Sequence, residues 1–215
     1  TRSSLCPLSI TSSPRWPVRG WHLHTQHPIE HVDFLNGLDA KSYGSRDPSL
    51  DEPWETMLPE VTNFFIWMLA NKQTSFEFAL LYSDEWWGPS TRSLTISRLT
   101  KIATHAHSLG IRIGVTATVI GPFQQHAYYL VNLHNASIAS NRTLASLSIK
   151  KHLHLLYDTI GFDYLSSEIG AGEFGSLDCD SMLSYLNETA AVSQNIHHKE
   201  IFIKIHVTNG AHCPT

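Results

Sequence analysis

Short apolar runs that end in polar residues recur along this chain, and most of them follow a segment with helical periodicity. Runs of this length and composition predict strands. The five predicted strands are Arg19–Thr25, Phe76–Tyr82, Ile111–Ile120, Phe162–Glu168 and Glu200–Thr208. Strands that alternate with helices are typical of a parallel α/β sheet. The carboxyl ends of its strands meet at one edge, so the polar strand ends are expected to gather there.

The segments between the predicted strands have the apolar spacing of helices. Gly110 follows one of these segments and Gly161 follows another, as expected at helix C-termini. The predicted helices are Glu55–Asn71, Ser93–Ser108, Thr143–Thr159 and a segment from Asp178 or Asp180 to Asn195.

This order of elements predicts a partial (β/α)8 TIM-type barrel, with an open doubly wound sheet as the alternative. A nucleotide-binding sheet is not indicated, because no glycine-rich phosphate motif follows the first strand. A closed barrel needs about 250 residues. We therefore expect an extended arm at residues 1–18, rich in Ser and Pro, and a barrel domain at residues 19–215. That domain is expected to continue in a missing or separate segment.

Composition and short motifs restrict the expected binding partners and the expected cellular location of the protein. The chain is 42% hydrophobic and carries a net charge of -4 without a basic stripe, so nucleic acid is not an expected partner. No apolar run has the length of a membrane span. Three glycosylation sequons, at Asn135, Asn141 and Asn187, favour a secreted, lumenal or cell-surface glycoprotein. The three cysteines Cys6, Cys179 and Cys213 lack zinc-site spacing and allow at most one internal disulfide.

Alternation along the strands predicts which side chains face away from the helices. In each strand the apolar residues of one parity belong under helices, and the polar residues of the other parity belong in the barrel lumen. The predicted inward residues are His22, His24, Glu77, Ser83, Glu85, Arg112, Gly114, Thr116, Thr118, Ser166, Glu168, Lys204 and His206. A face this polar is expected to hold a site, because buried polar groups without partners are costly.

Carboxylates at the strand ends are the candidate catalytic groups. Glu168 ends the fourth predicted strand and Glu173 follows in a glycine-broken loop, while Asp84 and Glu85 end the second strand. Two carboxyl groups that flank a sugar bond act as acid and nucleophile or as acid and base. In the alternative interpretation, Glu168 is an ion-pair partner of Lys204 or Arg112.

The segment RGWHLHT at Arg19–Thr25 resembles the start of a hexosaminidase-type (β/α)8 barrel, as found in many glycoside hydrolases. The resemblance implies a glycan-binding or glycan-hydrolysing protein, or a degenerate relative, with Glu168 as general acid and no cofactor. That family has an Asp-Glu pair where this chain has Ser167-Glu168. Other residues near strand ends are candidates for contacting a carbohydrate. These are His24, Trp86, Trp87, Tyr128, His206 and Asn209.

Two alternatives remain open. His22-x-His24 resembles the first-strand ligands of the amidohydrolase superfamily, which implies a zinc-dependent hydrolase with Glu168 and His206 as further ligands. In the other alternative the chain is a non-catalytic subunit of a larger assembly. A partial barrel leaves two sheet edges that a protein partner or a missing chain segment must cover.

Overall fold

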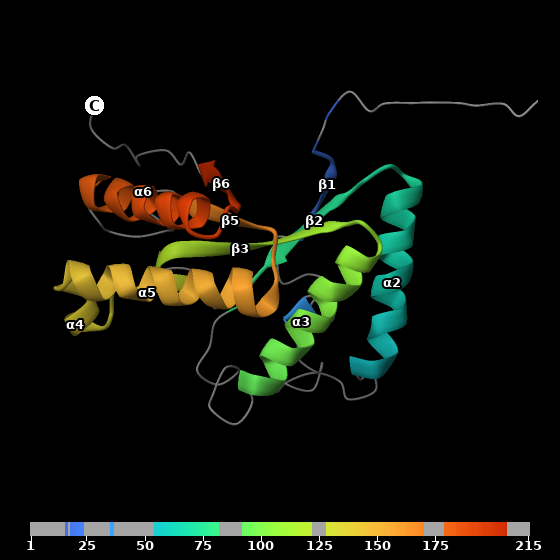
Figure 1. Cartoon of the computed structure of the whole chain (residues 1–215), viewed down its shortest axis with the longest axis horizontal. Helices are drawn as coiled ribbons and strands as arrows, with labels where there is room; N and C mark the ends of the chain where they lie inside the picture. The colour runs from blue at the N-terminus through green and yellow to red at the C-terminus, as the bar shows by residue number, and fades with distance from the viewer. Residues whose placement is uncertain are drawn as a thin grey trace, which may run out of the picture.

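A six-stranded sheet forms the centre of the structure, a computed structural model that describes residues 16, 18–23, 35–36, 54–81, 92–121, 128–169 and 179–205. The strand order is β1-β2-β3-β5-β6 (Figure 1), and β4 also pairs with β3. Every pairing among the described strands is parallel. The strands are β1 (Gly20–Leu23), β2 (Ser75–Ala79), β3 (Arg112–Gly121), β4 (Tyr129–Asn132), β5 (Tyr164–Ile169) and β6 (Glu200–Ile205).

The five strands predicted from the sequence are present and parallel, and they neighbour one another in chain order. The sequence did not predict β4. This strand lies on the β2 side of β3, because Leu80 O accepts the Tyr128 N–H and Tyr128 O accepts the Thr118 N–H. It therefore takes the place of β2 beside the last residues of β3. Four residues are too few for an alternating pattern to stand out.

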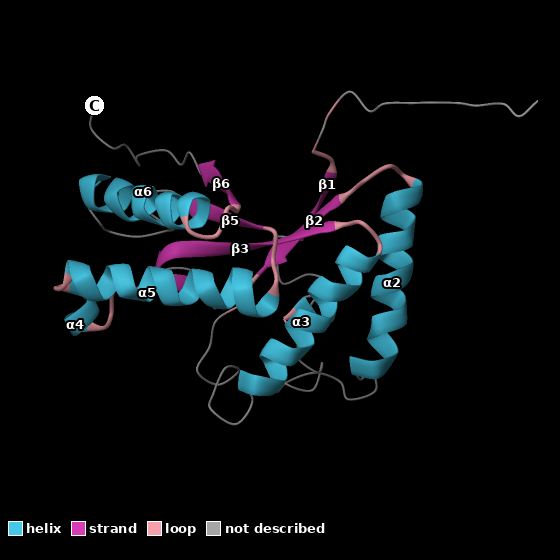
Figure 2. Cartoon of the chain, in the orientation of Figure 1, coloured by secondary structure: helices cyan, strands magenta, loops and turns pink. Residues whose placement is uncertain are grey.

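Helices connect the strands (Figure 2). They are α2 (Trp54–Ala70), α3 (Arg92–Ser108), α4 (Ala136–Ala139), α5 (Arg142–His154), the π-helical segment η3 (Leu155–Ile160) and α6 (Cys179–Asn195). Gly110 and Gly161 end α3 and η3 with φ angles of 75° and 97°, a conformation that glycine adopts without strain. No described helix combines the length and the hydropathy that a bilayer crossing requires.

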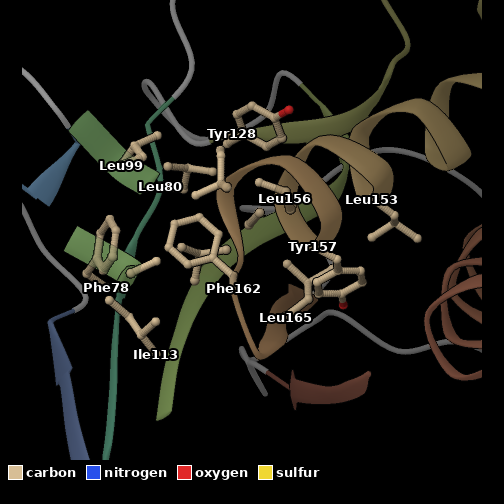
Figure 3. Close-up of a cluster of buried hydrophobic side chains, with 14 of the residues drawn as sticks. Phe78, Leu80, Leu99, Ile113, Tyr128, Leu153, Leu156, Tyr157, Phe162 and Leu165 are labelled. Carbon is tan, nitrogen blue, oxygen red and sulfur yellow. The ribbon is translucent and has the colours of Figure 1, made fainter. Parts of the chain in front are cut away.

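The core lies between one face of the sheet and the helices. Phe78, Ile113 and Leu165 project from neighbouring strands into a cluster of buried side chains (Figure 3). Residues of α2, α3, α5, η3 and α6 belong to the same cluster. These helices therefore cover the same face of the sheet, which is called the apolar face below. The other face is called the polar face.

Candidate functional site

The polar face carries a cluster of polar side chains from four different strands. His22 comes from β1, Glu77 from β2, Thr116 from β3 and Lys204 from β6. The alternation of the strands predicts all four on this face, and the structure brings them into contact. We call these four residues the polar network.

The carboxylate of Glu77 is the centre of the polar network. Its Oε1 lies 2.6 Å from His22 Nδ1 and 3.4 Å from Thr116 Oγ1, and it also accepts a hydrogen bond from Lys204 Nζ. Lys204 Nζ further lies 3.2 Å from Thr116 Oγ1 and 3.1 Å from each ring nitrogen of His22. One ammonium group thus links β6 to β1, β2 and β3 across the sheet.

The electrostatics keep Glu77 ionised. Burial by itself raises the pKa of this carboxyl group, but the hydrogen bonds and charges of His22 and Lys204 outweigh burial and lower the pKa to about 2. Only 11% of the Glu77 side chain is exposed, against 30% for Lys204. Glu77 is therefore an anion at neutral pH and cannot donate a proton as a general acid.

A tyrosine packs on the polar face beside the network, toward the amino ends of the strands. The Tyr164 hydroxyl donates to Phe76 O over 3.1 Å and lies 2.9 Å from Ser75 Oγ. Burial raises its pKa to about 12, so the hydroxyl stays protonated. The ring crosses β3 at Gly114, where a Cβ atom would lie only 2.3 Å from a ring carbon. The glycine thus permits a close approach within a strand.

Backbone pairing places Glu168 beside the polar network. Glu168 of β5 is in register with Lys204 of β6, on the neighbouring strand. The side chain of Glu168 lies outside the described part of the structure, so its predicted role as a catalytic acid stays a prediction. The same holds for the other candidates outside the described residues. These are His24, Asp84, Glu85, Trp86, Trp87, Glu173, His206 and Asn209.

Tyr128, a candidate for stacking on a sugar, lies elsewhere. Its side chain is 1% exposed and belongs to the apolar core. The hydroxyl is hydrogen-bonded to His152 Nδ1. Burial and the charges of Lys151 and Arg92 lower the pKa of His152 to about 4, so its imidazole is neutral at pH 7. Tyr128 therefore lies in the apolar core, and its contact with a carbohydrate stays a prediction.

The described residues do not favour a metal ion. Among them, no three histidine, cysteine, aspartate or glutamate side chains are grouped so that they could hold one. At the polar network the cation beside His22 and Glu77 is the ammonium group of Lys204. A divalent ion there would be repelled by that charge. The other candidate ligands, His24, His206 and the side chain of Glu168, lie outside the described residues.

The sequons lie on the surface. Asn135 and Asn141 are exposed N-cap residues, and the side-chain oxygen of each accepts backbone N–H groups of the following helix, α4 or α5. Asn187 is exposed on α6. Glycosylation at these positions stays a prediction.

Sequence reasoning placed Glu77 and Thr116 on the polar face but did not single them out as site residues. It chose Glu85 because that residue follows the end of a strand. Alternation predicts which face of the sheet each side chain is on. The contacts of Lys204 with side chains of three other strands depend on the tertiary structure. Tyr164 was also missed. Its signal was Gly114, a glycine in the interior of a strand.

Sequence comparisons with family models and with curated proteins find no relative of this chain. No protein-family model matches it, and no curated protein has significant sequence similarity to it.

Proposed function

We propose that this chain forms five consecutive strands of a (β/α)8-type barrel, with the helices that connect them. Support comes from the strand order, because consecutive parallel strands joined by right-handed crossovers carry all their helices on one face. A doubly wound sheet reverses its strand order and has helices on both faces. The described strands have no such reversal, and the described long helices pack on the apolar face.

We further propose that the barrel binds and hydrolyses glycans on its polar face, with Glu168 as general acid. The observation that carries this proposal is the polar network. Four polar side chains from four strands meet on the face away from the helices, and Glu168 is in register with one of them. An ionised carboxylate near a second carboxyl group fits the division of roles in glycoside hydrolysis.

The test is Glu168→Gln in the full chain or its assembled complex, assayed on a glycan array and for release of reducing sugar. We expect binding to persist and hydrolysis to fall by at least about 100-fold, because the amide keeps the shape but cannot donate a proton. The matched control is Glu188→Gln, a glutamate on α6 that pairs with Arg142. If neither glycan binding nor hydrolysis depends on Glu168, its role is that of a structural ion-pair partner.

A second candidate function is that of a subunit in a larger assembly, which the two sheet edges favour. At the β1 edge, Trp21 is 48% exposed and lies with its ring centroid 6.0 Å from that of Trp67 on α2. At the β6 edge, Ile203 is 46% exposed. Among the described strands, β1 and β6 each have one neighbour. A protein partner or a further segment of chain would cover both edges.

Sedimentation equilibrium tests the second candidate. The isolated chain has a mass of 24.1 kDa, so self-assembly appears as a multiple of that value. Trp67→Ser should weaken the assembly, whereas Leu147→Ser, at an exposed residue on α5, should not. If the chain keeps its monomer mass, alone and after incubation with extract from its source, the result would contradict the subunit role. For both candidates we propose a secreted or lumenal location, because the exposed sequons at Asn135, Asn141 and Asn187 would permit N-glycosylation there.

A further inference from the structure

The carboxylate of Glu77 uses only one of its two oxygens in the polar network. His22, Lys204 and Thr116 all contact Oε1. Oε2 makes no hydrogen bond with any described residue. It also does not belong to the described buried polar atoms that lack a partner, such as Ser167 Oγ. Oε2 is therefore in contact with solvent.

The network holds this oxygen in a fixed position. Lys204 has three N–H donors, and Glu77, Thr116 and His22 all lie within donor range of its nitrogen. The carboxylate that these groups hold is consequently oriented before any ligand arrives. An oriented acceptor binds a donor with a smaller loss of side-chain entropy than a mobile one.

The surroundings of Oε2 favour an uncharged donor. An anionic ligand would be repelled by the carboxylate itself, and a cationic ligand would meet the ammonium group of Lys204. The ring of Phe202 lies on the same face, two residues before Lys204 on β6, and the residue is 37% exposed. A hydrogen-bond acceptor and an exposed aromatic ring on the same face suit a ligand with both hydroxyl groups and an apolar face.

We propose that Glu77 Oε2 is a binding point for a neutral, polyhydroxylated ligand of the sugar class, and that it accepts a hydrogen bond from one ligand hydroxyl. This inference deepens the proposed glycan function and rests on it. Glu77 acts here as a binding residue, while proton donation belongs to Glu168.

The experiment compares the wild type, Glu77→Gln and the matched control Glu200→Gln. Glu200 lies on β6 and, like Glu77, pairs with a basic residue, here Arg112, but its side chain is 59% exposed. The probes are the methyl glycosides of glucose, galactose, mannose and N-acetylglucosamine, with their mono-deoxyfluoro analogues, titrated by calorimetry. Fluorine replaces the hydroxyl in size but donates no hydrogen bond.

We expect Glu77→Gln to weaken binding of the preferred glycoside by about 10- to 100-fold, the range for a hydrogen bond to a charged group. Glu200→Gln should change it by about twofold or less. One deoxyfluoro analogue should lose affinity for the wild type by a similar factor. On Glu77→Gln, this analogue should bind almost as well as the parent glycoside does, because the variant and the fluorine remove the same hydrogen bond.

A second measurement needs no variant. In wild-type protein labelled with carbon-13 at the glutamate carboxyl groups, Glu77 is recognised because it stays ionised down to about pH 2. Its resonance should move when the preferred glycoside is added. This titration decides the matter alone if Glu77→Gln does not fold.

The results separate this inference from the proposed function. Equal glycoside binding by the wild type and Glu77→Gln overturns the role of Glu77 and leaves a glycan function possible through other residues. Binding that depends on Glu77 without any glycan hydrolysis supports the inference and contradicts the hydrolytic role of Glu168. A wild-type Glu77 resonance that none of the four glycosides moves overturns the inference.

Discussion

The ionised carboxylate of Glu77 makes a specific prediction for stability. Replacing Glu77 with Gln removes the negative charge that Lys204 and His22 both contact, while it keeps the side-chain shape. The network lowers the pKa of Glu77 from 4.5 to about 2. That difference corresponds to about 3 kcal/mol of folding free energy at neutral pH. We therefore expect Glu77→Gln to lower the free energy of unfolding by about that amount at pH 7.

The pH dependence follows from the direction of the pKa change. A carboxyl group whose pKa is lower in the folded state stabilises the fold above its unfolded pKa, and the contribution is lost as pH falls through the folded pKa. The difference between the wild type and Glu77→Gln should be full above about pH 4.5 and should shrink between pH 4.5 and 2. Below about pH 2 both proteins carry an uncharged side chain, so the difference should vanish.

The assay is urea unfolding followed by circular dichroism across this pH range. Glu200→Gln is the control, because Glu200 and Arg112 form an exposed pair. Exposed pairs contribute about 0–1 kcal/mol. The network does not stabilise the ionised carboxylate as described if Glu77→Gln lowers the free energy of unfolding no more than Glu200→Gln does. The same conclusion follows if the effect of Glu77→Gln does not change with pH.

Three further predictions test other parts of the structure. Gly114→Ala should destabilise the protein by about 1–3 kcal/mol in urea unfolding, because its Cβ would lie 2.3 Å from the Tyr164 ring; an unchanged midpoint contradicts this packing. His152 is buried and near the charges of Lys151 and Arg92, so it should titrate near pH 4 in proton NMR. The unfolded chain binds a proton at this histidine at higher pH than the folded chain does, so the free energy of unfolding should decrease as pH falls from 6.5 toward 4. A titration midpoint near pH 6.5 contradicts the burial of His152. Intact-mass analysis of native protein before and after glycan removal should show sugar on at least one sequon, and an unchanged mass contradicts secretory maturation.

Much of the sheet could be predicted because local signals agree with the tertiary fold. The glycines at positions 110 and 161 have positive φ angles at the two helix ends where sequence reasoning placed them. The strands were found from runs of apolar residues, and their parallel order from the alternation with helices. In contrast, β4 is short, and its place in the sheet depends on hydrogen bonds from the preceding residue, Tyr128, to Leu80 and Thr118, which no local pattern predicts.

The candidate site was predictable only in part. Alternation assigned His22, Glu77, Thr116 and Lys204 to one face, because side chains in a strand point alternately to its two faces. It could not show which of the carboxylates on that face would be paired. Pairing depends on the register of strands far apart in the chain, such as β2 and β6, and on the length of the Lys204 side chain. Tyr128 was expected near a ligand, but its burial depends on packing that periodicity does not describe.

The most direct test of the proposed site is to map glycan binding onto the backbone amide resonances of the isotopically labelled protein. We predict that the preferred methyl glycoside shifts amides around Glu77, Thr116 and Lys204, on three strands that meet at the polar network. The amide resonances of helix residues on the apolar face should not shift. Shifts confined to the exposed edges near Trp21 and Ile203, or no shifts at all, would contradict a carbohydrate site on the polar face.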